Sequence, residues 1–206
     1  MGRPSRNRIT RDGATVAALE IIDRDGLDAL SLELVAGALG VKAPSLYYHF
    51  RDKAELLAEV ARHVLLDLGP AVGGEAVAQD WNEAMVGVCL ATRRTLLKHP
   101  NAAPLLLQFF PRHITLRGYD HWIANCPYPP DVRMTLLEGT EKLTYASALF
   151  EAAAQVRGVP AMPSVDPERL PHLALAQAAN PYDAEGLFEQ TIRTFLAGFR
   201  VRPGDA

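Results

Sequence analysis

The stretch from Gly40 to Phe50 constrains the fold more than any other part of the 206-residue sequence. Gly40 suits the positive φ that ends a helix, and Pro44 suits the first position of the next helix, where its missing N–H costs nothing. The residues before this stretch fit a short helix capped by Ser31, with apolar side chains at three- and four-residue spacing. The sequence therefore predicts two short helices joined by a tight turn, which is a helix-turn-helix.

The second of these helices has the pattern of a surface that reads DNA. At 100° per residue, Leu46 and Phe50 face inward and the side chains between them face outward. Small and aromatic groups suit base edges in the major groove, and polar or cationic groups suit the phosphates beside it. We expect base contacts from Ala43, Pro44, Ser45 and Tyr48, phosphate contacts from Tyr47, His49 and Lys53, and either kind from Lys42. The alternative is that the tyrosines are packing residues and His49 is merely solvated.

The charges along the chain are unevenly distributed. The formal net charge of −3 does not favour binding to a polyanion, yet only basic charges precede the first acid, Asp12. Two lysines and an arginine bracket the segment 43–50, whereas four acids gather between residues 20 and 28. Attraction to DNA is therefore expected on one face only. Arg3 and Arg6 are candidate contacts of a basic arm in the minor groove, and the alternative is a solvated tail.

A longer pattern contains the helix-turn-helix. It consists of Leu39-Gly40-Val41, Pro44-Ser45-Leu46-Tyr47-Tyr48-His49-Phe50, Asp52-Lys53 and Leu56-Leu57. These residues resemble the signature of the TetR (tetracycline repressor) family, and the resemblance covers roughly residues 8 to 68. A weaker similarity to the ligand-binding half of repressors close to the tetracycline repressor continues at Trp81, at Lys98-His99-Pro100 and between Leu170 and Phe199. The expected DNA contacts lie where members of the family make theirs.

The apolar periodicity and the turn signals predict an all-α chain. We expect an N-terminal helix-turn-helix domain over residues 8–68, joined by a linker helix to a larger helical domain over residues 80–202. The first helix lies between Thr10 and Gly26, with Val16, Leu19 and Ile22 facing inward. Helices are predicted over about residues 11–25, 31–39, 43–50, 52–64, 80–99, 102–110, 114–125, 131–157, 170–178 and 184–201.

Two of the predicted helices in the second domain carry broad apolar faces. The last helix has a bulky stripe with spacings of four, three and four residues, and the long helix over 131–157 has a similar face. Such faces either form the core of one subunit or pair with their copies in a four-helix bundle. The family resemblance favours the homodimer. The candidate interface residues are Leu149, Ala153, Phe188, Ile192, Phe195 and Phe199.

The second domain also contains aromatic and apolar residues that suit a ligand pocket. The candidate lining comprises Trp81, Met85, Val88, Leu106, Phe109, Phe110, His113, Trp122, Tyr145 and Phe150, although aromatic residues at helical spacing are more often plain core. When the sequence is laid against the tetracycline repressor, the positions of its polar drug and magnesium ligands are Gly69, Val88, Leu106 and Phe109. The resemblance therefore implies a largely apolar effector rather than tetracycline.

Several classes of protein are disfavoured by what the sequence lacks. Cys89 and Cys126 have no CxxC spacing, which indicates a packed thiol and a loop thiol rather than a disulfide or a metal site. Neither a membrane span nor a secretory signal is evident, so we expect a cytoplasmic protein without a membrane partner. No nucleophile elbow or phosphate loop is found, so we expect neither an enzyme nor a cofactor.

These patterns predict a ligand-responsive regulator that binds double-stranded DNA as a homodimer. Its two-fold symmetry implies a palindromic operator with half-sites about one helical turn apart, roughly 34–36 Å or a little more. A small-molecule effector is expected to release the repressor from this operator. The alternative is a ligand-sequestering or protein-binding module that no longer uses its helix-turn-helix on DNA.

Overall fold

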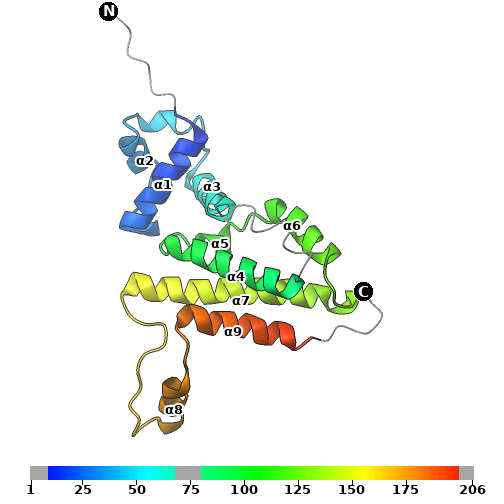
Figure 1. Ribbon diagram of the computed structural model, residues 1–206. Helices are drawn as coiled ribbons and strands as arrows, with labels where there is room; N and C mark the ends of the chain where they lie inside the picture. Colours follow the sequence, from blue (N-terminus) through cyan, green and yellow to red (C-terminus); the bar gives the residue numbers. More distant parts are fainter. Residues whose placement is uncertain (1–8, 68–79, 200–206) are drawn as a thin grey trace, which may run out of the picture. The chain divides into compact units, whose positions relative to one another are not determined.

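The computed structural model describes residues 9–67 and 80–199, and these residues fold into two compact helical units (Figure 1). The described parts of the chain contain no strand, so the predicted all-α class is confirmed. The first unit combines the residues up to Asp67 with the segment His99–Pro111. The second unit contains the remaining described residues. The predicted division at residues 68–80 did not anticipate that His99–Pro111 groups with the first unit.

The first unit consists of short helices. They are α1 (Arg11–Asp25), α2 (Leu32–Ala38), α3 (Lys53–Leu66) and α5 (Leu105–Gln108), with 3₁₀ turns η1 (Leu27–Ala29) and η2 (Ala43–Ser45). The predicted boundaries of α1 are confirmed, because Thr10 Oγ1 accepts the Gly13 N–H at 3.0 Å and Gly26 ends the helix with a φ of 87°. Val16 was wrongly placed in the core, since it is 36% exposed. The buried face of α1 consists mainly of alanine and isoleucine, which turns Val16 toward solvent.

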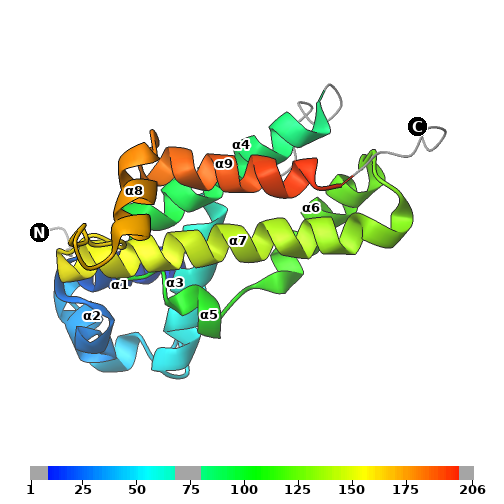
Figure 2. The same ribbon diagram turned by 90° about the horizontal axis from the view of Figure 1, so that it is seen from below.

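The second unit is built on three long helices that lie side by side, α4 (Trp81–Lys98), α7 (Pro130–Arg157) and α9 (Ala184–Ala197) (Figure 2). The shorter helices are α6 (Arg112–Ala124) and α8 (Pro171–Ala179). Asp80 caps α4 by accepting the N–H groups of Asn82 and Glu83 at 3.0 and 3.1 Å. None of the described helices has both the length and the apolar character needed to cross a bilayer.

Helix α8 differs from the rest of this unit because none of its residues is buried. Figure 1 shows it at the end of a long connection, apart from α4, α7 and α9. Leu173 and Leu175 are among the large apolar side chains that it exposes. An isolated helix of this length is only marginally stable in water, and α8 buries none of its side chains against the described residues.

The contact between α7 and α9 depends on a glycine. Gly139 of α7 lies under the ring of Phe195, and a Cβ atom at this position would overlap the tip of that ring. The ring itself is held in an aromatic cluster, because its centroid lies 5.2 Å from that of Phe199. The close approach of these two helices therefore requires a residue without a side chain.

Gly139→Ala is expected to destabilise the protein by about 1–3 kcal/mol, because Phe195 must leave its packed position. Gly87→Ala is the matched control, since Gly87 is exposed within α4 and an added Cβ would meet nothing within 4 Å. It should stabilise the protein by about 0.5–1 kcal/mol, through the better helix propensity of alanine. Urea denaturation of both variants would measure these changes, and equal effects of the same sign would contradict the expectation.

Candidate functional sites

The segment 42–50 follows a turn at Gly40, whose φ is 67° as the sequence predicted. The structure shortens the predicted helix to the 3₁₀ turn η2 followed by further turns. Its backbone bonds are local: Ser45 N–H donates to the Lys42 carbonyl at 2.9 Å, and His49 and Phe50 N–H both donate to the Leu46 carbonyl, at 2.8 and 2.9 Å. The segment is therefore one tight helical stretch between α2 and α3.

The side chains of this stretch divide into a buried pair and an exposed group. Leu46 and Phe50 are 0% and 1% exposed, as the four-residue spacing predicted. Tyr47 and Tyr48 are 52% and 90% exposed, so they do not belong to the core as in the alternative interpretation. The other predicted DNA contacts in this unit are exposed or half-buried, namely Lys42, Ala43, Pro44, Ser45, His49 and Lys53. Arg3 and Arg6 lie outside the described residues.

The charges around this stretch leave two cations free. Asp52 caps α3 by accepting the Glu55 N–H at 2.8 Å, and Glu55 Oε2 accepts the Arg51 N–H at 2.9 Å. The bond from the Arg51 backbone, followed by those from the Arg11 and Arg51 side chains, lowers the pKa of Glu55 to about 2. Lys42 and Lys53 form no ion pair with any residue that the structure describes. Their charges are available to an external anion.

The predicted ligand-lining residues are divided between the two units. Leu106, Phe109 and Phe110 lie in the first unit, and the other seven lie in the second. Within the second unit, Trp81, Met85 and Trp122 are buried in its core, where Trp81 Nε1–H donates to the Trp122 carbonyl at 3.0 Å. Val88 and Tyr145 are half-buried, whereas His113 and Phe150 are exposed.

Polar groups that the sequence pattern does not indicate lie near Tyr145, between α6 and α7. Arg112 Nη1–H donates to Glu141 Oε2 at 3.0 Å. Burial raises the pKa of Tyr145 and of Tyr119 above the ordinary value of a phenol. Burial also raises the pKa of the Cys89 thiol to about 11. Cys89 is thus an unreactive packed thiol, as predicted, and Cys126 is a loop thiol between α6 and α7, also as predicted, although it is buried.

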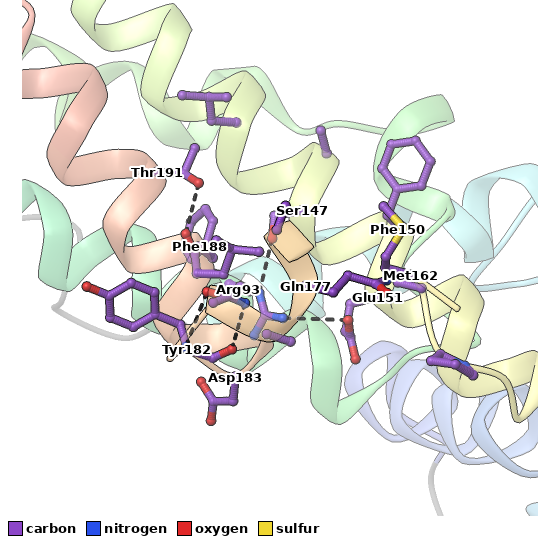
Figure 3. A pocket seen from close by; sticks show the side chains of 18 of the residues that line it. Arg93, Ser147, Phe150, Glu151, Met162, Gln177, Tyr182, Asp183, Phe188 and Thr191 are labelled. Carbon is purple, nitrogen blue, oxygen red and sulfur yellow. Dashed lines mark hydrogen bonds and ion pairs between the residues drawn. The ribbon is translucent and has the colours of Figure 1, made fainter. Parts of the chain in front are cut away.

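A large groove lies between α7, α8 and α9 within the second unit (Figure 3). Its volume is about 960 Å³, and its walls include Leu143, Phe150, Leu173 and Leu187. Arg93 of α4 lies in the groove and is only 4% exposed. Its Nε–H donates to Ser147 Oγ at 3.2 Å, and its guanidinium carbon lies 5.7 Å from the centroid of the Phe188 ring. Arg93 thereby joins α4 to both α7 and α9.

Some of the predicted interface residues lie in the core of the second unit, and others lie at its surface. Phe188 and Ile192 are buried in the core of the subunit, and Phe195 and Phe199 pack against that core. Ala153 is exposed and Leu149 is half-buried. The outward face of α9 instead carries Leu187 and Thr191, which lie beside the predicted stripe and line the groove. The apolar stripe of α9 therefore faces the core of the subunit, and the periodicity alone does not tell which edge of the helix faces outward.

Comparison with known proteins gives consistent matches. The family model described as bacterial regulatory proteins, tetR family, matches residues 15–60. The class D tetracycline repressor of Escherichia coli is 25% identical over 205 residues, covering 95% of this chain and 91% of that protein. An HTH-type transcriptional regulator of Saccharopolyspora erythraea is 35% identical over 102 residues, which is 47% of this chain and 40% of that protein.

Solved structures resemble the whole described fold. A possible TetR family transcriptional regulator from Streptomyces coelicolor A3(2) has a TM-score of 0.76 and 26% identity, covering 92% of this chain and 98% of that one. ActR of Streptomyces coelicolor, solved in complex with (S)-DNPA, has a TM-score of 0.73 and 25% identity, covering 93% of this chain and 96% of that one. The similarity therefore extends over both helical units.

Proposed function

Because this chain belongs to the TetR family of bacterial regulatory proteins, we propose that it is a ligand-responsive repressor that binds a palindromic DNA operator. The observation that carries this proposal is the stretch 42–50, in which a buried Leu46 and Phe50 hold two exposed tyrosines outward. Lys42 and Lys53 flank these tyrosines with charges that no described residue neutralises. A protein that had abandoned DNA would have no need to keep this arrangement, so the alternative of a sequestering module is not favoured.

The exposed side chains fall into one group that suits the bases of DNA and another that suits its phosphates. Tyr48 is the most exposed of them and, with Ala43, Pro44 and Ser45, suits base edges and thymine methyl groups. Tyr47, His49 and Lys53 suit the phosphates on either side. Lys53 is the first residue of α3, so its ammonium group extends from the end of a helix whose N-terminus already attracts anions.

The exposed apolar surface of the second unit supports a homodimer. Phe150 is 76% exposed, and Leu187 on the opposite wall of the groove is half-exposed. Helix α8 borders the same groove and has no buried residue. A second copy that fills the groove would cover both walls and give α8 the packing partner that it lacks. The two-fold symmetry of this dimer matches that of a palindromic operator.

The effector is proposed to be a small, largely apolar molecule that binds in the second unit. ActR, a structural relative, was solved with a small molecule. Val88 is apolar at a position where the tetracycline repressor uses a polar ligand, which favours a largely apolar molecule. The free energy that couples an effector site to a second binding site is typically about 1–3 kcal/mol. The effector should therefore weaken operator binding roughly 5- to 150-fold.

Selection of binding sites from random duplex DNA tests the proposed function. The wild-type protein should enrich one palindrome, whereas the double variant Tyr47→Ala/Lys53→Ala should enrich none, because it removes two phosphate contacts from each subunit. Both residues lie at the surface, so the double variant should keep the thermal stability of the wild type. Failure of the wild type to enrich any sequence at low salt would reject the repressor and favour the sequestering module.

A further inference from the structure

Arg11 makes an unusual set of contacts for an arginine at the start of a helix. Its Nη2–H donates to Glu55 Oε1 at 2.8 Å, and its Nη1–H donates to the backbone carbonyl of His49. The guanidinium carbon lies 4.5 Å from the centroid of the Phe50 ring. One side chain of α1 thus contacts the end of the stretch 42–50 and the first turn of α3 at the same time.

These contacts show that the charge of Arg11 is used within the protein. In the sequence it is the last of the basic residues that precede the first acid, a position that suggests a phosphate contact. In the structure its guanidinium is directed toward the protein, with Glu55 Oε1 and Glu59 Oε2 at 2.8 and 3.9 Å. Glu55 and Glu59 also pair with Arg51 and Arg62, so their charges are shared, but the bonds to Glu55 and to the His49 carbonyl hold the Arg11 guanidinium against the protein.

The stretch that Arg11 holds cannot fix its own orientation. It has only a few local backbone bonds, which are too few to stabilise a helix by themselves. Its position therefore depends on tertiary contacts, which are the buried Leu46 and Phe50 and the bond from Arg11 to the His49 carbonyl. Glu55 completes the arrangement from the other side, since its second oxygen binds both the backbone N–H and the Nε–H of Arg51.

We propose that Arg11 is a positioning residue for DNA reading, which sets the orientation of the stretch 42–50 and thereby sequence selectivity without contacting DNA. The proposal rests on the proposed function of this surface. Arg11 acts through its hydrogen bond to the His49 carbonyl, and His49 directly follows the outward-facing Tyr47 and Tyr48 in the sequence. A small rotation of this stretch would move both tyrosines relative to the base edges while leaving the phosphate contact from Lys53 in place.

Arg11→Met tests this proposal, because methionine keeps an unbranched side chain over Phe50 but removes the charge and the donors. Affinity for the selected operator and for a scrambled duplex would be measured between 50 and 200 mM salt. The ratio of the two affinities should fall about tenfold, while the salt dependence of binding stays that of the wild type. Lys53→Ala calibrates the assay, since loss of one phosphate contact from each subunit, two per dimer, should lower the salt slope by about two.

Arg24→Met is the matched control. Arg24 lies on the same helix and pairs only with its neighbour Asp25 among the described residues, so its loss changes the net charge equally without affecting the stretch 42–50. It should leave both the affinity ratio and the salt slope unchanged. A salt slope that falls in Arg11→Met with an unchanged ratio would show that Arg11 contacts phosphate, and would overturn the proposal.

Hydrogen exchange gives a readout that does not depend on DNA. In Arg11→Met, peptides covering residues 43–52 should exchange faster, while peptides from the middle of α1 should exchange as in the wild type. Unchanged exchange in residues 43–52 would overturn the positioning role. If the wild type itself shows no sequence preference, the proposed function fails and the reading role of Arg11 fails with it. If the wild type is sequence-selective and Arg11→Met has the same affinity ratio, the role of Arg11 is rejected while the proposed function stands.

Discussion

Leu187→Glu combined with Phe150→Glu is expected to yield a monomer that binds the palindromic operator about 10²- to 10⁴-fold more weakly than the wild type. The two side chains line opposite walls of the groove that we assign to the second copy. Glutamate at these positions would be buried without a partner in the dimer but solvated in the monomer, so it selectively penalises association. A monomer engages one half-site and loses the gain in effective concentration that links the two reading surfaces.

Light scattering coupled to size-exclusion chromatography would measure the mass, and a titration of labelled operator would measure the affinity. Leu116→Glu is the matched control, because Leu116 is a similarly exposed leucine of α6 that does not line the groove. It should remain dimeric and bind the operator normally. A double variant that stays dimeric would show that the two copies pair through another surface.

The sequence predicted those features whose causes are local. The first helix begins at Thr10 and ends at Gly26 because a hydroxyl cap and a positive φ act within one turn of the residues that they define. The turn at Gly40 and the inward pair Leu46 and Phe50 depend on a spacing of four residues or fewer. The outward direction of the two tyrosines follows from the same spacing, because they lie between the members of this pair.

Features that depend on contacts between distant residues could not be predicted. Phe195 belongs to an apolar stripe that fits an interface equally well, and only its contact with Gly139 of another helix places it inside the subunit. The sequence groups Arg11 with a basic arm, because its partner Glu55 is 44 residues away. Nothing in the sequence near Arg93 indicates the groove. Periodicity shows which helices have apolar faces, but the neighbour of each face is decided by tertiary packing.

The segment His99–Pro111 is the clearest case, because its grouping with the first unit rests on bonds to α1. His99 Nδ1 lies 2.6 Å from Asp23 Oδ2, and Asn101 Nδ2–H donates to the Asp23 carbonyl at 3.0 Å. Leu105, in the one-turn helix α5, is fully buried. Because α4 ends at Lys98, the chain passes directly from a long helix of the second unit into this segment. The covalent path from the second unit therefore enters the fold of the DNA-reading unit itself.

Phe50→Ala is expected to destabilise the first unit, including this segment, while the stability of the second unit is unchanged. Phe50 is 1% exposed and lies against the guanidinium of Arg11, so its truncation should cost about 3–5 kcal/mol. A domain has only about 5–15 kcal/mol of stability in total, so this loss removes a large part of it and greatly raises the population of the opened unit. Tyr48→Ala is the matched control, since Tyr48 is 90% exposed and its loss should change stability by no more than about 0.5 kcal/mol.

Hydrogen exchange measured by mass spectrometry distinguishes the two units in the Phe50→Ala variant. Peptides from α1, α3 and residues 99–108 should lose protection together, whereas peptides from α7 and α9 should keep theirs. Protection that persists in residues 99–108 would show that this segment is held by the second unit instead. Joint loss would establish that this segment is folded into the reading unit. The chain joins the two units at three places, after α3 and at each end of residues 99–111, so an effector in the second unit has three covalent connections to the operator-binding unit.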